Sequence, residues 1–592
     1  MQISKRILYA LGIIPALLCL AATQSKFPRE ALPLEQCFKA PDESTLSNII
    51  TKNLKDLLSS MVATPTVRSE DLNSSDELKN IQKVKDLLDA QVEIYNKNNT
   101  HKLNLFEWKK EIDGKPFWVF GYRLGKGDKK ISLITHVDVV PANVEGAFEL
   151  KCENRLYEGV MQPFFVGRGA LDNKGPTIAT LSAVEALAQI VPAKSLDNFT
   201  IELVIDTSEE VELGAHHYFA ESKSNSPDLG VVVDAAWCTV AEKGIERPVF
   251  SFPKDKKNPS KGLWIKSISV PEDNPANVIP DFAQAVINAR DKEDINKLKN
   301  NIQELYKNYA FDDPDYRRAK LSVSQNKDGM LVLRTEVSGA QHGSAPQENR
   351  EHGANPLVSL LNFLAHLTKT KVLAPNAYSN MALFAHDTFG TTVFGEKHPD
   401  LLQRSDSLFK RSENNGTTYA VTKTDSNDDA VQLFLDIRYG LKHQQCGWDN
   451  KTFGTLKGKS VFRDTFEELV NNFKKETSID MTFETTTAAA PDLKDTSNEA
   501  FQKINSAFKK IMKKDCPQKA IGGATDSKGE SALITAGALF DFKFGYPTYY
   551  HGKSEGVPVN DLYKTSEILF EFLKQEVESP KTKKRKTVIR QH

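Results

Sequence analysis

The chain has 592 residues, of which 40% are hydrophobic and 26% are charged, a composition typical of globular proteins. It is too long for one hydrophobic core, so we expect two or more domains. The formal net charge of -1 excludes a strong positive field that would draw nucleic acid or an anionic membrane to the surface.

The two ends of the chain differ from the rest. Residues 1–25 combine Lys5 and Arg6 with an apolar run from Ile7 to Ala22, which is the layout of a secretory signal peptide. We therefore expect export to a periplasm, to the cell exterior or to a vacuole-like lumen, and no stable membrane insertion of the mature chain. The basic tail, residues 578–592, is expected to be a solvated end; a nuclear address is the alternative, which the signal peptide disfavours.

The cysteines that remain after the signal segment are odd in number and widely spaced: Cys37, Cys152, Cys238, Cys446 and Cys516. They contain no CxxC pair, so they indicate neither a dense disulfide framework nor a cysteine zinc site. One or two disulfide bridges in an oxidising compartment stay open.

The first part of the mature chain alternates between helical and β-rich patterns. Apolar residues between Leu46 and Tyr95 recur at helical spacing, which predicts two opening helices. β-rich runs over 131–135, 200–205 and 229–233 are separated by helical stretches over 177–190 and 213–221. This alternation indicates an α/β fold with a parallel sheet covered by helices, whose ligands lie beyond the carboxyl ends of the strands.

The second part changes texture between about residues 247 and 488, where the sequence is polar and rich in Lys and Asn. An inserted domain explains this change. We expect a catalytic domain made of residues 40–246 and 489–577, with residues 247–488 inserted. The expected elements are helices over 295–309, 357–368 and 463–475, a connector at TTTAAAP (485–491), a helix over 499–512, a Gly-rich loop over 521–523, another helical run and a final helix over 562–576.

Side chains suited to metal binding follow the predicted strands. His136-Val137-Asp138 places an imidazole beside a carboxylate that could accept its second ring N–H. Asp172 lies between a glycine turn and a predicted helix. Glu209 and Glu210 leave their strand in different directions, so one can bind metal while the other takes a proton from metal-bound water.

Asp234 and His551 complete the set. Taken singly, each of these residues has a structural interpretation, such as a polar strand end, a helix N-cap, a solvated acidic turn or a structural histidine. Taken together and in this order, they supply five nitrogen and oxygen ligands and one free carboxylate. Such a set suits two metal ions about 3.5 to 4 Å apart.

The order of motifs resembles that of the aminoacylase, carboxypeptidase G and carnosinase superfamily of dinuclear zinc peptidases, and within it the peptidase V-like dipeptidases. The resemblance extends from about residue 45 to 577. It rests on THVDVVP (135–141), GRGALDNKGP (167–176), DTSEE (206–210), VVVDAAW (231–237), AEKG (241–244), NVIPD (277–281), QHGSAP (341–346), LDIRYG (435–440), IGGAT (521–525) and HGKSEGVPVNDL (551–562).

The resemblance implies a catalytic domain with a mostly parallel mixed sheet, covered by helices, and an inserted α+β lid domain. It also implies two Zn²⁺, for which Mn²⁺ or Co²⁺ can substitute, held by His136, Asp172, Glu210, Asp234 and His551. Asp172 would bridge the ions, Asp138 would orient His136, and Glu209 would be the general base for a zinc-bridging hydroxide. A cis peptide bond would follow at Asp172-Asn173.

The inserted region would act as a lid over the metal pair, with Asn277, His342 and Arg438 reaching towards it. His342 would stabilise the oxyanion, and Arg438 would hold the terminal carboxylate of the substrate. The loop that ends at Thr525 would line the pocket, which makes Thr525 an expected substrate-binding residue. This loop continues with Asp526-Ser527-Lys528 where the family has Tyr-Ala-Arg, so the substrate preference stays open.

An Asp at position 234 is typical of the aminopeptidase and dipeptidase branch and favours substrates with a free amino end. We therefore expect hydrolysis of dipeptides or short peptides, by a monomer in which the enlarged lid replaces a dimer partner. An N-acyl-amino-acid amidohydrolase or a carboxypeptidase with the same site is the alternative. A non-catalytic binding module is a further alternative, which the full ligand set disfavours.

Overall fold

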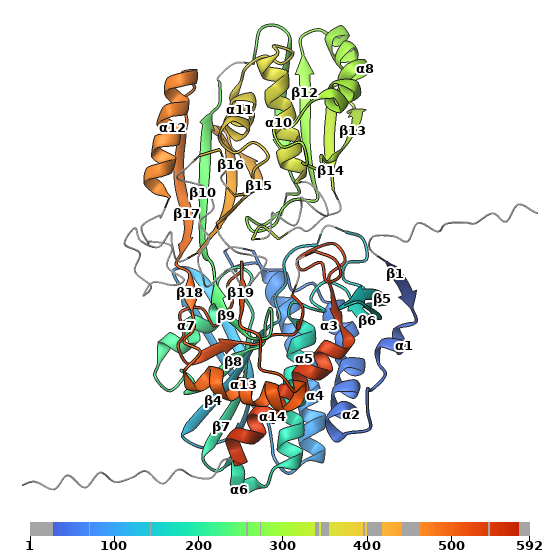
Figure 1. Cartoon of the computed structure of the whole chain (residues 1–592), viewed down its shortest axis with the longest axis vertical. Helices are drawn as coiled ribbons and strands as arrows, with labels where there is room; N and C mark the ends of the chain where they lie inside the picture. Colours follow the sequence, from blue (N-terminus) through green and yellow to red (C-terminus); the bar gives the residue numbers. More distant parts are fainter. Residues whose placement is uncertain are drawn as a thin grey trace, which may run out of the picture.

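The computed structural model describes residues 28–578 except 70, 143, 256–257, 273, 338–341, 345–354, 395–396, 399–416, 441–461 and 543–544. The chain forms two lobes along its long axis (Figure 1). The predicted signal peptide and nearly all of the basic tail lie outside the described residues. Within the described ranges, no helix combines the length and apolarity needed to cross a membrane.

The larger lobe is built on a nine-stranded mixed sheet with the order β18-β9-β20-β8-β4-β7-β3-β2, and β19 pairs with β9. The strands are β2 (Asn104–Ile112), β3 (Lys115–Gly125), β4 (Lys129–His136), β7 (Phe199–Asp206), β8 (Leu229–Val232), β9 (Thr239–Glu242), β18 (Asp492–Leu493), β19 (Lys519–Ile521) and β20 (Leu533–Thr535). Pairing is parallel in the centre, from β20 through β8 and β4 to β7, and antiparallel at β3 and β2. The predicted mixed α/β sheet is confirmed, with its parallel part at the centre.

Helices cover both faces of this sheet because alternate residues of each strand point to opposite sides. Leu133 packs in the main core, whereas its neighbour Ile134 packs in a second cluster with Phe219 of α7. The helices of this lobe are α1 (Leu34–Cys37), α2 (Thr45–Asn53), the π-helix η1 (Leu54–Leu58), α3 (Ser59–Val62), α4 (Ser75–Asn98), α5 (Lys174–Ile190), α6 (Ala193–Leu196), α7 (Gly214–Glu221), α13 (Glu499–Met512) and α14 (Val559–Glu578).

A small antiparallel sheet and two disulfide bridges complete this lobe. The sheet has the order β1-β5-β6-β21 and consists of β1 (Arg29–Leu32), β5 (Lys151–Tyr157), β6 (Val160–Val166) and β21 (Gly556–Pro558). The bridges join Cys37 to Cys152 and Cys238 to Cys516. Both therefore connect segments far apart in the sequence, while Cys446 lies outside the described residues.

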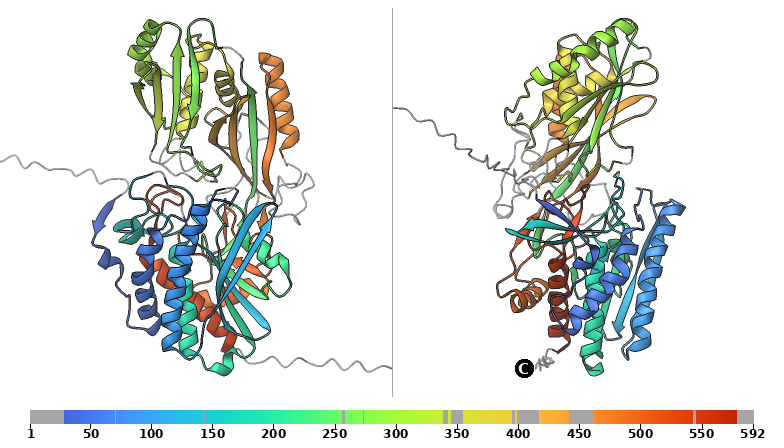
Figure 2. Two further views of the ribbon diagram at one scale, coloured as in Figure 1. Left: turned by 180° about the vertical axis from the view of Figure 1, so that it is seen from behind. Right: turned by 90° about the vertical axis from the view of Figure 1, so that its right-hand side faces the viewer.

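The smaller lobe has two four-stranded sheets, β15-β16-β10-β17 and β11-β12-β14-β13. Its elements are β10 (Gly244–Pro253), β11 (Leu263–Ser269), β12 (Phe282–Ala289), α8 (Lys292–Asn308), β13 (Lys320–Gln325), β14 (Leu331–Glu336), α10 (Pro356–Lys369), α11 (Ala377–Thr388), β15 (Thr418–Ser426), β16 (Ala430–Tyr439), α12 (Arg463–Thr477) and β17 (Thr482–Ala489). Figure 2 shows from two further sides that β10 and β17 lead from one lobe into the other.

Two expectations about local structure were wrong. The TTTAAAP segment is a connector only at its end, because residues 485–489 belong to β17 and pair with β10. β-branched threonines fit such a half-exposed strand, and Ala488 and Ala489 are buried where the lobes meet. The helical run expected after the Gly-rich loop is absent from the described residues there, where Leu533–Thr535 pair with β8 as a strand instead.

Candidate metal centre and substrate cavity

The candidate metal ligands meet at one edge of the central sheet. His136 ends β4, the Glu209-Glu210 pair follows β7, and Asp234 follows β8. Because these strands are parallel neighbours, their carboxyl ends open on the same side, as expected for a ligand site in such a sheet. Asp172, in the turn before α5, and His551, in the turn before β21, complete the group.

Asp172 lies between the two histidines. Its Oδ1 is 3.0 Å from Nε2 of His136, and its Oδ2 is 2.8 Å from Nε2 of His551. His551 Nε2 is also 3.2 Å from Oε2 of Glu210. One carboxylate thus faces both imidazoles, which is the placement expected of a ligand shared by two ions.

Six side chains form two groups that could each hold a metal ion. In one group, ligand atoms of His136, Glu209 and Asp234 lie within 4.8 Å of one another, and in the other those of Asp172, Glu210 and His551 do. All six had been singled out from the sequence. The grouping places Glu209, the expected general base, beside ligands of the first group.

Asp138 positions residues of both ligand groups. Its carboxylate accepts hydrogen bonds from the backbone N–H groups of Glu209 (3.1 Å) and Glu210 (3.0 Å), which fixes the turn after β7. The backbone carbonyl oxygen of Asp138 lies 3.1 Å from Nδ1 of His136 as its hydrogen-bond partner, and Oδ1 lies 3.4 Å from the same nitrogen. Asp138 therefore orients the histidine ring and the acidic pair at once.

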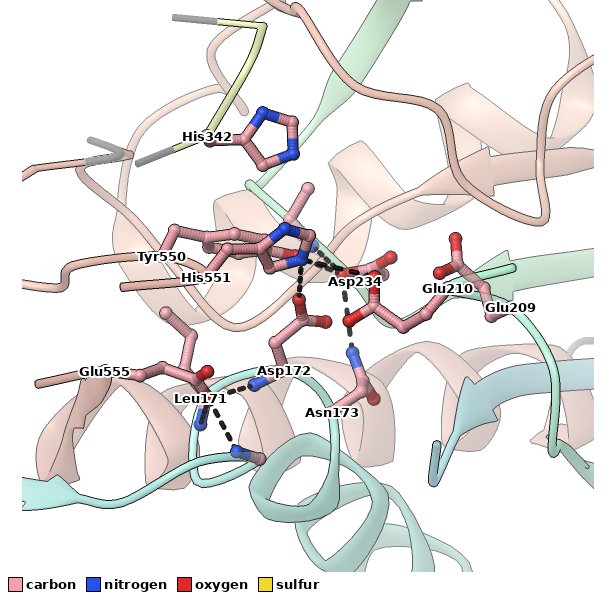
Figure 3. A network of polar contacts seen from close by, with 12 residues as sticks. Leu171, Asp172, Asn173, Glu209, Glu210, Asp234, His342, Tyr550, His551 and Glu555 are labelled. Carbon is pink, nitrogen blue, oxygen red and sulfur yellow. Dashed lines mark hydrogen bonds and ion pairs between the residues drawn. The ribbon is translucent and has the colours of Figure 1, made fainter. Parts of the chain in front are cut away.

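Sequence reasoning missed Glu555, which holds the turn that carries Asp172 (Figure 3). Its Oε1 accepts the backbone N–H groups of Gly169 (2.9 Å), Leu171 (3.2 Å) and Asp172 (3.1 Å). Its other oxygen pairs with Arg168. The signal for this contact was present in two separate motifs, GRGALD and HGKSEG, but nothing in the sequence shows that they touch.

Two further residues that were missed hold Asp234. The hydroxyl of Tyr550 donates to Oδ1 of Asp234 at 3.0 Å, and Nδ2 of Asn173 lies 3.4 Å from the same oxygen. The peptide bond between Asp172 and Asn173 is cis, as expected. Asp234 and Asp172 are therefore positioned by neighbours in the site.

Burial and neighbouring charges shift the pKa values of the carboxylates in the site. Burial, together with the charge of Asp172, raises the pKa of Glu210 to about 7 and that of Asp234 to about 6. Burial opposes ionisation of Asp172 as well, but hydrogen bonds from His136 and His551 outweigh it and hold its pKa well below the usual range. So many buried carboxylates call for a compensating cation.

A cavity of about 350 Å³ opens above these ligands and is lined from both lobes. The predicted lid residues Asn277, His342 and Arg438 line it opposite Asp172 and His551. The ring of His342 lies 4.7 Å from that of His551, centroid to centroid. In Figure 3, His342 faces the ligand cluster from the lid side.

The contacts of His342 define its protonation. Its Nδ1 accepts the backbone N–H of Ser344 at 3.1 Å, so the ring proton lies on Nε2. Burial and the positive charges of His551 and Arg438 lower its pKa well below the usual value. His342 is thus a neutral imidazole that can act as a hydrogen-bond donor.

The loop around Thr525 was expected to line the pocket, with Thr525 as a substrate-binding residue. Thr525 lines the cavity, but its backbone N–H and hydroxyl both donate to the carboxylate of Glu242, at 3.2 and 2.7 Å. Asp526 is buried and is not among the residues that line the cavity. Lys528 is buried as well and donates to the carbonyl of Lys243 at 2.6 Å. The two residues that depart from the family pattern, Asp526 and Lys528, therefore do not line the cavity.

The fold and the paired ligand groups define a metal-dependent hydrolase. Residues 133–575 match the model of peptidase family M20/M25/M40, and the chain belongs to this family. It is therefore a metallopeptidase.

Curated relatives and solved structures are similar to this chain along most of its length. A Staphylococcus saprophyticus protein named "Putative dipeptidase" is 25% identical over 460 residues, covering 76% of this chain and 83% of its own length. Human carnosine dipeptidase 1 superposes with a TM-score of 0.47 at 11% identity, covering 91% of this chain and 100% of its own. The dipeptidase Dug1p of Saccharomyces cerevisiae gives 0.48 at 12% identity, covering 91% and 99%.

Proposed function

We propose that the protein is a dinuclear zinc dipeptidase that hydrolyses dipeptides or short peptides with a free amino end. The observation that carries this proposal is the pair of ligand groups that meet at Asp172, beneath a cavity whose opposite wall holds His342 and Arg438. The dipeptidase names of the curated relatives support the substrate class.

The residues present fit two metal ions. His136 and Asp234 would hold one ion, Glu210 and His551 the other, and Asp172 would lie between them. Oε1 of Glu210 is buried without a hydrogen-bond partner among the described residues, as suits a metal ligand. Bound there, the ions would supply a water of lowered pKa and a Lewis acid for the substrate carbonyl.

The protein's own groups would carry the proton and position the substrate. Glu209 would accept the proton of the attacking water and deliver it to the leaving amine. Its side chain is mostly buried and lies 3.9 Å from Nε2 of His136, so it is close to where the water would bind. The Nε2–H of His342 would donate to the oxyanion, and Arg438 would bind the terminal carboxylate of the substrate.

Other features of the chain support a wider assignment. We infer that residues 40–246 and 489–577 form the catalytic domain, that 247–488 form the lid, and that the protein acts as a monomer. The bridges Cys37–Cys152 and Cys238–Cys516 support export through the signal peptide, because disulfides persist in oxidising compartments.

A substrate panel tests the proposal. Ala-Ala, β-Ala-His, Ala-Ala-Ala and N-acetyl-Ala are incubated with Zn²⁺, Mn²⁺ or a chelator, and Glu209→Ala is the matched control. We expect the free-amine peptides to be cleaved, and chelation and the substitution each to abolish turnover. Cleavage of N-acetyl-Ala alone would replace the proposal with an amidohydrolase, and no cleavage under any metal would leave a binding module.

A further inference from the structure

The lid wall of the cavity carries a second arginine, Arg247. It lies on β10, two residues after Ile245, so both side chains point from the same face of the sheet. Ile245 pairs with Arg438 on β16, and Arg247 pairs with Thr487 on β17. All four residues line the cavity.

Asp436 joins the two arginines from beneath. Its Oδ2 accepts a hydrogen bond from Nε of Arg438 at 2.8 Å, and its Oδ1 accepts one from Nε of Arg247 at 3.2 Å. Asp436 itself is fully buried. One carboxylate between two guanidinium groups leaves one positive charge in excess on this wall, which faces the incoming substrate.

The two arginines differ in which of their N–H groups remain available to bind a ligand. The side chain of Arg438 is 3% exposed, and its Nη1 donates to the carbonyl of Gly522 at 3.1 Å. The side chain of Arg247 is 24% exposed, and among the described residues Asp436 is its hydrogen-bond partner through Nε alone. The terminal Nη fork of Arg247 therefore stays available in the cavity, and such a fork matches a carboxylate in geometry and charge.

We propose that Arg247 is a second carboxylate-binding residue, which selects dipeptides whose C-terminal residue has an acidic side chain. This assignment rests on the proposed function, in which Arg438 binds the terminal carboxylate. Arg247 lies two residues along β10 from Ile245, the strand partner of Arg438, and two residues along a strand span about 7 Å. Because both guanidinium groups converge on Asp436, the side chain of a C-terminal Asp or Glu held at Arg438 lies next to Arg247.

The test compares Ala-Glu with its neutral isostere Ala-Gln. In the wild-type, metal-loaded protein we expect kcat/KM to be at least about 10-fold higher for Ala-Glu, the discrimination typical of a charge-assisted hydrogen bond in a protected site. Arg247→Gln should bring the ratio close to one, and Arg247→Lys should restore part of it. Arg334→Gln removes an arginine that pairs with Glu336 on β14, away from the cavity lining, and should keep the wild-type ratio.

The ratio of kcat/KM for Ala-Glu to kcat/KM for Ala-Gln shows whether Arg247 binds the substrate or only supports Asp436. If Arg247 served only to hold Asp436, its replacement would slow Ala-Glu and Ala-Gln equally, and an unchanged ratio would overturn the inference. A loss confined to Ala-Ala-Ala would also overturn it, because the carboxylate at Arg247 would then be that of a longer main chain. Failure of the wild type to cleave either dipeptide would instead refute the proposed function.

Discussion

Nε2 of His551 lies 2.8 Å from Oδ2 of Asp172, although 379 positions separate the two residues in the chain. The histidine comes from the second part of the larger lobe, and the aspartate comes from the first. The candidate metal centre is thus complete only when both parts of the chain, on either side of the inserted segment, have folded together.

The adjacent acidic residues should separate catalysis from metal binding. We expect Glu209→Gln to lower kcat by about 10²- to 10⁴-fold with unchanged metal content, because it removes a proton acceptor. Glu210→Gln should lower the metal content itself. Elemental analysis of the purified variants, alongside their kinetics, distinguishes the two effects. Loss of metal from Glu209→Gln would show that this residue is a ligand, as its grouping with His136 and Asp234 allows.

Metal removal should destabilise the fold. The buried carboxylates around Asp172 repel one another, and bound ions would neutralise them. Ligand binding to the native state stabilises it by about 3 to 4 kcal/mol at 100 to 1,000 times Kd, so chelation should lower Tm clearly. Differential scanning calorimetry with and without chelator measures this. The variant His551→Ala should show a smaller shift; an equal shift would place the metal elsewhere.

The two lid residues should affect different kinetic constants. His342→Ala should lower kcat by about 10²- to 10³-fold with little change in KM, since an oxyanion donor acts in the transition state. Arg438→Met should raise KM, because it removes a contact made to bound substrate. Steady-state kinetics on Ala-Ala provides both constants. A KM effect alone for His342→Ala would contradict its assigned role.

Stability should fall as the pH rises through the range in which Glu185 ionises. Burial raises the pKa of Glu185 to about 7. The hydrogen bond from Asn53 lowers this pKa but offsets burial only in part. The pKa of Glu185 is higher in the folded state than in the unfolded state. The free-energy cost of ionising Glu185 in the folded protein is therefore absent below about pH 4.5, grows up to pH 7 and reaches about 3 kcal/mol above it. Glu185→Gln should therefore be the more stable protein in urea at pH 8 and lose this advantage at pH 5.

An exposed helical glutamate serves as the control for that measurement. Glu93, on α4, is 73% exposed at its side chain, and Glu93→Gln should leave the pH dependence unaltered. If Glu185→Gln and Glu93→Gln behave alike, burial is not the origin of the effect.

The bridge between Cys238 and Cys516 should stabilise the larger lobe. It connects positions 278 residues apart, directly before β9 and shortly before β19. Removal of a native bridge typically costs about 2 to 5 kcal/mol, because the unfolded chain gains freedom. We expect the double variant Cys238→Ala/Cys516→Ala to show this loss in urea unfolding. Under reducing conditions the difference from the wild type should shrink; a difference that persists would trace to packing.

The sequence by itself determined most of the local elements and the residue types available at the candidate site. The apolar pattern predicted helix α13 at residues 499–512, and continuous β-rich runs predicted the strands that lead to His136 and Asp234, which are buried on both faces. The types and order of the ligands were sufficient to predict a two-metal site, since histidine and carboxylate side chains carry their chemistry wherever they lie.

Only the tertiary structure decided which segments pair and which side chains converge. The TTTAAAP segment became a strand because β10 offered it an edge, and Glu555 became a support for Asp172 because two distant turns meet. Likewise, Arg247 lines the cavity only because β10 and β16 bring it beside Asp436. Such contacts depend on long-range packing, which no local pattern encodes.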